Sequence, residues 1–222
     1  MTVIAIDGPA GSGKSTVARL LAERLGYLYV DTGAMYRTVA YLALRDGVAL
    51  DDAASLAALT RGAHIVFTSD GKVLAGETEV TGEIRGPSVS AAVSEVSAHA
   101  AVREILVEQQ RRMAQDTDVV MEGRDIGTVV FPEAAVKVFL TARPEIRAER
   151  RRKELVERGE HQSVAETLAA IEQRDRYDST RDVAPLRQAH DAVVIDTSDM
   201  TISEVVAALE RLVCGNPGLG AR

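Results

Sequence analysis

Gly8-Pro9-Ala10-Gly11-Ser12-Gly13-Lys14-Ser15 is the most informative motif of this chain. It fits the pattern G-x-x-x-x-G-K-[ST], in which glycines let the backbone curl so that successive N–H groups point at one anion. The apolar run Val3-Ile4-Ala5-Ile6 before it predicts a buried strand. A helical spacing of apolar residues follows, and Gly26 would end that helix. Strand, loop and helix in this order predict a phosphate-binding loop at the positive end of a helix.

The loop predicts a nucleoside triphosphate as ligand. Lys14 can reach the β- and γ-phosphates, and the Ser15 hydroxyl can ligate Mg²⁺, which makes Ser15 the expected metal ligand. Asp7 and Glu122 are further candidates for holding the water shell of that ion. The residues expected to contact the nucleotide are Gly8, Pro9, Ala10, Gly11, Ser12, Gly13, Lys14, Ser15 and Thr16.

Charge and composition narrow the class of protein. With 222 residues the chain suits one domain, or one domain with insertions. Its net charge of −7 argues against a nucleic-acid binder that relies on a general positive field. Arginine far outnumbers lysine, which occurs only at Lys14, Lys72, Lys137 and Lys153. Arginine grips phosphate with two hydrogen bonds, although the codon preference of a GC-rich genome would produce the same excess.

The remaining composition favours a soluble cytoplasmic protein. The single cysteine, Cys214, fits a reducing compartment. No apolar run approaches the roughly 20 residues of a membrane-spanning helix, so we expect no membrane partner. The chain enters its first strand directly, without the pattern of a signal peptide.

Strand-like and helix-like segments alternate along the chain, which is typical of an α/β fold with a parallel sheet. We expect strands at 3–6, 27–30, 118–121, 135–140 and 192–196. We expect helices directly after the loop, at 33–44, at 51–59 and from Thr201 onward. The last of these helices would begin with the capping box Thr201-Ile202-Ser203-Glu204. Residues from 214 to 222 are rich in Gly and Pro, and we expect a flexible tail there.

Two stretches interrupt the alternation. Short strands joined by turns, one at Ser69-Asp70-Gly71, predict a small α+β insertion over 62–98. An arginine-rich helix from Pro144 to about Gly159, followed by a capping box at Ser163, predicts a short helical lid over 144–163. The core would then comprise 1–61, 99–143 and 164–222.

Three clusters supply candidates for a second anion site. Asp31-Thr32-Gly33-Ala34-Met35-Tyr36-Arg37 and Gly123-Arg124-Asp125-Ile126-Gly127-Thr128 each follow a predicted strand at the carboxyl edge of the sheet, where ligands of open α/β folds bind. In the third cluster, Arg174, Asp178 and Arg181 share one face if the segment is helical. Surface ion pairing is the alternative reading of each cluster.

These runs, together with Gly82-Glu83-Ile84-Arg85 and Val129-Val130-Phe131-Pro132, resemble the bacterial cytidylate (CMP/dCMP) kinases in order and spacing over nearly the whole chain. The resemblance implies a parallel-sheet P-loop core of the nucleoside-monophosphate-kinase type, an α+β insertion that binds the monophosphate, and a lid. It also implies ATP as the donor. Such kinases are often monomeric, and a monomer is expected here.

The resemblance also implies roles for individual residues. The acceptor phosphate would be held by Arg37, Arg124 and Arg181, with Tyr36 and Thr32 nearby. The sugar hydroxyls would contact Arg174 and Asp178, and the cytosine would be read by Ser94, Arg103 and Asp125. A carboxylate or hydroxyl can accept a hydrogen bond from the cytosine amino group, whereas uracil presents a carbonyl there.

The expected reaction is in-line transfer from ATP·Mg to CMP or dCMP. Besides Lys14, Arg124 and Arg181, the lid arginines Arg147 and Arg151 are expected to be catalytic, closing over the transferred group. A kinase for UMP, AMP or dTMP is one alternative. A nucleotide-dependent switch is another, although the chain lacks the Asn/Thr-Lys-x-Asp motif that reads guanine.

Overall fold

The strand that precedes the phosphate-binding loop, β1 (Val3–Asp7), is buried along its whole length. It lies between two parallel neighbours, β6 (Val119–Gly123) and β7 (Val136–Thr141). The sheet order is β2-β6-β1-β7-β8, with β2 (Leu28–Asp31) and β8 (Val193–Asp196) at its edges. The β7–β8 pair is also parallel. The expected α/β fold with a parallel sheet is therefore confirmed.

A computed structural model describes residues 1–68 and 71–216, and packing divides the chain into two units. The first contains residues 1–29 and the chain from 114 onward; the second contains residues 30–113. Residues 69 and 70 of the expected turn at Ser69-Asp70-Gly71 lie outside the described residues. Of the expected tail over 214–222, Cys214 is the last residue of α8, and residues 217–222 lie outside the described residues. None of the helices formed by the described residues is long and apolar enough to cross a membrane.

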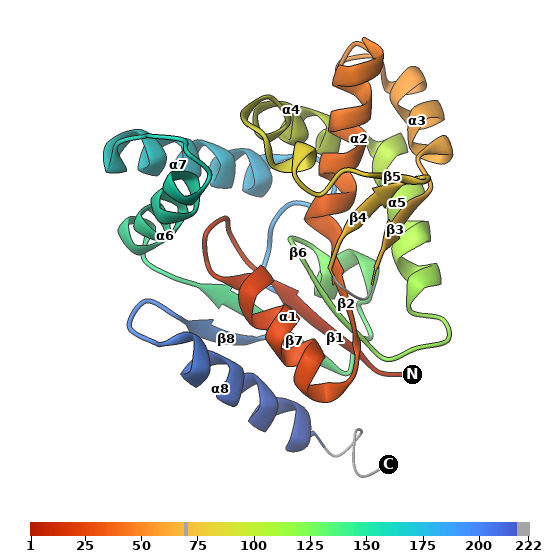
Figure 1. Ribbon diagram of the computed structural model, residues 1–222. Helices are drawn as coiled ribbons and strands as arrows, with labels where there is room; N and C mark the ends of the chain where they lie inside the picture. The colour runs from red at the N-terminus through yellow and green to blue at the C-terminus, as the bar shows by residue number, and fades with distance from the viewer. Residues whose placement is uncertain (69–70, 217–222) are drawn as a thin grey trace. The chain divides into compact units, whose positions relative to one another are not determined.

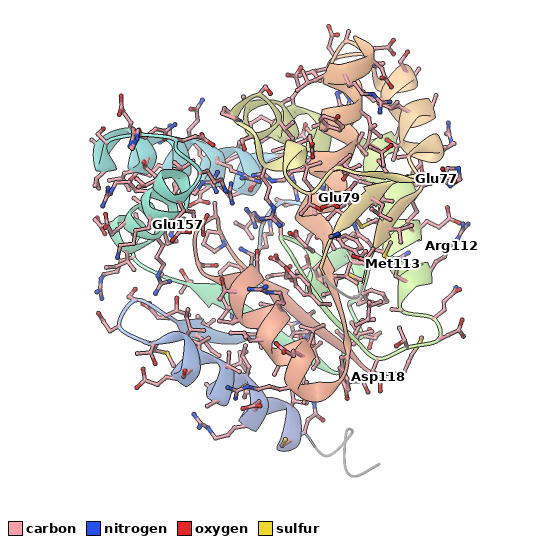
Figure 2. The ribbon with its side chains drawn as sticks, in the orientation of Figure 1. Glu77, Glu79, Arg112, Met113, Asp118 and Glu157 are labelled. Carbon is pink, nitrogen blue, oxygen red and sulfur yellow. The ribbon has the colours of Figure 1, made fainter. Side chains whose placement is uncertain are left out.

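Four α-helices formed by the described residues also belong to the first unit (Figure 1): α1 (Lys14–Leu25), α6 (Pro144–Glu157), α7 (Val164–Thr180) and α8 (Ile202–Cys214). The first and last of these pack together, and Leu21 and Leu209 share a buried apolar cluster with β1 and β7. Helices α6 and α7 lie against each other as a hairpin, with Glu157 at the carboxyl end of α6 (Figures 1 and 2). Capping boxes begin α7 at Ser163 and α8 at Thr201, as the sequence predicts.

The second unit has its own core. Its described elements are α2 (Thr32–Asp46), α3 (Ala53–Gly62), β3 (Ile65–Phe67), β4 (Val73–Ala75), β5 (Thr78–Glu79), a 3₁₀ helix (Glu83–Arg85), α4 (Pro87–Ala98) and α5 (Ala100–Met113). The three short strands form an antiparallel sheet, and Glu77 and Glu79 mark its β4–β5 hairpin in Figure 2. Met35, Val93 and Leu106, from α2, α4 and α5, are buried in one cluster. This unit extends beyond the expected insertion of 62–98 on both sides, because α2, α3 and α5 share its core.

Candidate active site

Glycines allow the phosphate-binding loop to lie against the elements around it. Gly8 has a φ of 151°, and a Cβ atom there would lie 2.0 Å from the carbonyl oxygen of Leu140 in β7. Gly11 has a φ of 72°, and a Cβ atom would lie 2.9 Å from the carbonyl oxygen of Arg147 in α6. Both conformations are unfavourable for residues with side chains. The loop is therefore shaped by close backbone packing on two sides.

Lys14 is folded back onto this loop. Its Nζ donates to the carbonyl oxygen of Pro9 at 2.7 Å and to Oγ of Ser12 at 3.4 Å. Burial, together with the positive charge of Arg124, lowers the pKa of Lys14 to about 7. A phosphate group beside the ammonium would oppose this destabilisation of the charged form. The lysine therefore lies where an anion is electrostatically favoured.

Ser15, the expected metal ligand, is paired with a carboxylate. Its hydroxyl donates to Oε1 of Glu122 at 2.5 Å, and the Tyr29 hydroxyl donates to the same oxygen at 3.2 Å. Glu122 belongs to β6 and is buried. A hydroxyl and a carboxylate are the hard oxygen ligands that Mg²⁺ prefers, so these side chains fit a magnesium ion and its water shell.

Asp7 has a different set of partners from Glu122. Its two carboxylate oxygens accept from the backbone N–H groups of Ile126 at 2.8 Å and Gly127 at 2.7 Å. These residues begin a π-helical turn, Ile126–Val130, which sequence reasoning missed because five-residue turns of this kind have no periodic signal. Burial raises the pKa of Asp7 to about 6. Asp7 therefore fixes the segment that follows Asp125.

The arginines and aspartates at the carboxyl edge of the sheet form one cluster. Arg124 Nε lies 2.9 Å from Asp178 Oδ2, and Arg174 Nε lies 3.9 Å from the same oxygen. Arg181 lies 3.9 Å from the other carboxylate oxygen of Asp178 and 3.7 Å from Asp125. The structure thus brings together the five predicted site residues of this unit outside the loop and lid.

Burial and charge act against each other in this cluster. Burial alone would raise the pKa of Asp178, but Arg124, Arg174 and Arg181 hold it below its ordinary value. Burial lowers the pKa of Arg174 to about 10, helped by the charge of Arg124. Its Nε is buried, and no described residue forms a hydrogen bond with it. With three arginines and two aspartates, the cluster retains positive charge that an anionic ligand would neutralise.

The two predicted lid arginines have different surroundings. Arg147 is 6% exposed and donates to the carbonyl oxygens of Ala142 and Ala10, at 3.0 and 2.9 Å, and to Asp175 at 2.5 Å. Arg151 is partly exposed and pairs with Glu154 at 3.0 Å. Arg147 is thus bound into the protein, while Arg151 lies on the surface of α6.

The second unit holds the remaining predicted residues. Arg37, in α2, donates to Oγ of Ser90 at 2.8 Å and to the carbonyl oxygen of Ile84 at 3.3 Å. The guanidinium of Arg103 stacks on the Tyr36 ring, 5.3 Å from its centroid, which is the geometry of a cation–π contact.

The other predicted residues of this unit lie on the same elements. Arg103 donates to the carbonyl oxygen of Ser97, one helical turn after the half-buried Ser94. Thr32 is buried at the start of α2, where Asp31 caps the helix.

Sequence reasoning missed three residues that orient predicted ones. Asp175 binds Arg147, Ser90 binds Arg37, and Tyr29 binds Glu122. Asp175 stands inside the quoted run Arg174–Arg181 and could have been found there by its charge. A lone serine and a lone tyrosine carry no such signal, because their partners come from distant parts of the chain.

Comparisons with known proteins bear directly on this site. The family model described as cytidylate kinase matches residues 4–214. A protein named cytidylate kinase from Geobacter sp. (strain M21) is 52% identical over 95% of this chain and 92% of its own. One of the same name from Rhodococcus jostii (strain RHA1) is 48% identical over 98% and 97%.

Solved structures show a likeness of fold. Shikimate kinase from Acinetobacter baumannii, in complex with shikimate, has a TM-score of 0.50 and 15% identity, with 98% of this chain and 95% of that one covered. At this identity the likeness supports the kinase-type α/β fold alone.

Proposed function

We propose that this chain, which belongs to the cytidylate kinase family, transfers the γ-phosphoryl group of ATP to CMP or dCMP and releases ADP with CDP or dCDP. The proposal is supported by the family match over residues 4–214. The sequence is also 52% and 50% identical to two curated cytidylate kinases. The phosphate-binding loop and the arginine cluster supply the two anion sites that such a transfer needs.

The chemistry requires little of the protein beyond positioning and charge. The second pKa of a phosphate monoester is about 6, so the attacking oxygen of CMP is already ionised near neutral pH. Lys14 would hold the β- and γ-phosphates of ATP. Arg151 in the lid over 144–163 would approach the group in transfer, offsetting its charge and excluding water. The sequence predicts the same role for Arg147, whose contacts with Ala10 and Asp175 would have to open for it to take part.

Mg²⁺ is part of the proposal. Ser15 would ligate the ion and Glu122 would hold its water shell, as the 2.5 Å contact between them supports. When bound, the ion would neutralise charge on the β- and γ-phosphate oxygens.

The acceptor is assigned to the residues that the family resemblance implies. Arg37, Arg124 and Arg181 would hold the phosphate of CMP, with Thr32 and Tyr36 nearby. Arg174, whose buried Nε has no hydrogen bond among the described residues, would contact the sugar hydroxyls with Asp178.

The base is assigned to three further residues. Ser94, Arg103 and Asp125 would read cytosine, because a carboxylate can accept from its amino group and arginine can donate to its N3 and O2 atoms. The region around 62–98 would serve as the monophosphate-binding part of the chain.

We also propose a cytoplasmic monomer whose ligands are small molecules. The net charge of −7 and the single cysteine support this assignment. Sedimentation of the purified protein tests the monomer, and a dimer at micromolar concentration would contradict it.

The function is tested by release of ADP from ATP·Mg with CMP, dCMP, UMP, AMP and dTMP at equal concentrations. A response confined to CMP and dCMP is expected. A dominant response to another monophosphate would overturn the assignment of Ser94, Arg103 and Asp125. Hydrolysis of ATP without an acceptor preference would favour the switch.

A further inference from the structure

The tip of the phosphate-binding loop is held from outside by two charged side chains. The backbone N–H of Ala10 donates to Oδ1 of Asp175 at 3.2 Å, and the carbonyl oxygen of Ala10 accepts from Nη1 of Arg147 at 2.9 Å. The second carboxylate oxygen of Asp175 accepts from Arg147 at 2.5 Å. Both polar groups of one loop residue are thereby bound by one ion pair.

This ion pair is itself well supported. The side chain of Arg147 is 7% exposed and that of Asp175 is 20% exposed. Nε of Arg147 is fixed by the carbonyl oxygen of Ala142, just before α6. A charge-assisted contact of this kind loses little to solvent screening and is stronger than a hydrogen bond between neutral groups.

The backbones of the loop and of α6 are also in close contact. The backbone of Arg147 lies so close to Gly11 that any Cβ atom there would clash with its carbonyl oxygen. Asp175 comes from α7, which packs along α6. The loop tip is therefore tied to both helices of the hairpin, through α6 by Arg147 and through α7 by Asp175.

We propose that the Arg147–Asp175 ion pair is a positioning device for ATP, because it holds the Ala10 peptide in the orientation that lets the loop receive the nucleotide's phosphates. Asp175 is a positioning residue: it acts on ATP through Ala10 and Arg147. Arg147 acts in the same way, in place of the direct contact with the transferred group that its position in the sequence suggests. The inference rests on the proposed function, in which this loop binds ATP.

Each carboxylate oxygen of Asp175 has its own function in this proposal, because one accepts from Ala10 and the other from Arg147. Asp175→Ala removes both acceptors, whereas Asp175→Asn keeps one oxygen, enough for either Ala10 or Arg147. A hydrogen bond to a charged group contributes about 1.5–3 kcal/mol, so Asp175→Ala should raise the KM for ATP about ten- to a hundredfold. Asp175→Asn should give a smaller rise, and the KM for CMP should change less than about twofold in both.

Glu172→Gln is the matched control. Glu172 lies one turn earlier on α7, is exposed, and loses the same unit of charge when replaced. Its KM for ATP should equal that of the unaltered protein. Thermal unfolding of each variant would show whether the fold is intact.

Two measurements keep this proposal separate from the function itself. Calorimetric titration with ADP reports on the loop without any acceptor, so it works even if CMP proves to be the wrong substrate. Hydrogen exchange should show faster exchange of the amides of residues 10–14 in Asp175→Ala, with β1 and β7 unchanged.

Three outcomes would overturn the proposal. One is an ADP affinity of Asp175→Ala equal to that of Glu172→Gln. Another is an equal rise in the KM values for ATP and CMP, which would indicate a general structural effect. The third is a hundredfold loss of kcat in Arg147→Ala with normal nucleotide binding in Asp175→Ala, which would place Arg147 on the transferred group.

Discussion

Nε of Arg124 lies 2.9 Å from Oδ2 of Asp178, although 54 residues separate them in the chain. Arg124 is assigned to the acceptor phosphate and Asp178 to the sugar of the same nucleotide. The carboxylate that would bind the sugar therefore also orients the guanidinium that would bind the phosphate. Recognition of the two parts of CMP should be coupled through this contact.

Replacing Arg124 by lysine tests that coupling. The charge remains, but the planar fork that can bind Asp178 and phosphate together is lost. We expect the KM for CMP to rise at least about tenfold, since hydrogen bonds between charged groups contribute about 1.5–3 kcal/mol. Steady-state kinetics measures this, with the same exchange at the exposed Arg176 as the control. A KM for CMP as low as in the control would remove Arg124 from the acceptor site.

Lys14→Ala should abolish turnover while the protein stays folded. The lysine side chain contacts its own loop, so its loss leaves the buried core intact. We expect kcat to fall at least about a hundredfold, as when one preorganised charge donor is removed from other active sites. ADP release and a thermal unfolding curve give the two readouts. Activity near that of the unaltered protein would exclude the loop from the mechanism.

Asp125→Ala should weaken the preference for CMP over UMP. Asp125 is 5% exposed and lies 3.7 Å from Arg181, so its carboxylate is oriented within the cluster. Loss of a base-reading acceptor should reduce the ratio of kcat/KM values by about tenfold or more. The exposed Asp182, replaced in the same way, provides the control. An unchanged ratio would assign cytosine recognition to other residues.

Asp7 should impose a pH dependence on stability. Burial raises its pKa from 3.8 to about 6, so the folded protein retains a proton that the unfolded chain has lost between these values. Its contribution to the free energy of unfolding is present below pH 3.8 and is lost as the pH rises through 6. We subtract the free energy of unfolding of Asp7→Asn from that of the unaltered protein. This difference should fall by about 2 kcal/mol from about pH 4.5 to pH 7.

Urea unfolding of both proteins at the two pH values measures this difference. The comparison isolates Asp7, because every other titrating group is common to the two proteins. A difference that rises with pH would show that the hydrogen bonds from Ile126 and Gly127 outweigh burial.

Gly8→Ala and Gly26→Ala separate close packing from backbone preference. Both glycines have positive φ, but a Cβ atom at Gly8 would overlap the carbonyl oxygen of Leu140, whereas one at Gly26 meets nothing within 4 Å. We expect Gly26→Ala to lower the free energy of unfolding by about 1–2 kcal/mol. Gly8→Ala should cost clearly more and should weaken ATP binding. Equal costs would show that the loop can move away from β7.

The sequence predicts the parts of this protein that depend on local chemistry. Capping boxes at Ser163 and Thr201 begin helices as expected, and apolar runs such as Val136-Lys137-Val138 form strands. These features are encoded by neighbouring residues, so a single sequence contains them in full. The family membership was also predictable, because the motifs that carry it are long and ordered.

Features that join distant segments were not predictable. The boundaries of the second unit depend on packing among α2, α4 and α5. Contacts between separate helices leave no signal in the pattern of neighbouring residues. The contact of Asp175 with Ala10 joins residues 165 positions apart. The roles assigned to individual site residues stay predictions for the experiments above.

The position of β1 in the sheet has a consequence for synthesis on the ribosome. This strand leaves the ribosome well before its two sheet partners, which begin at Val119 and Val136. Residues 30–113 form a continuous unit with its own core and can fold in the interval. During this interval the apolar strand β1 has no sheet partner, so its backbone can pair with a strand other than β6 or β7. The nascent chain should thus need protection at β1 until β7 has emerged.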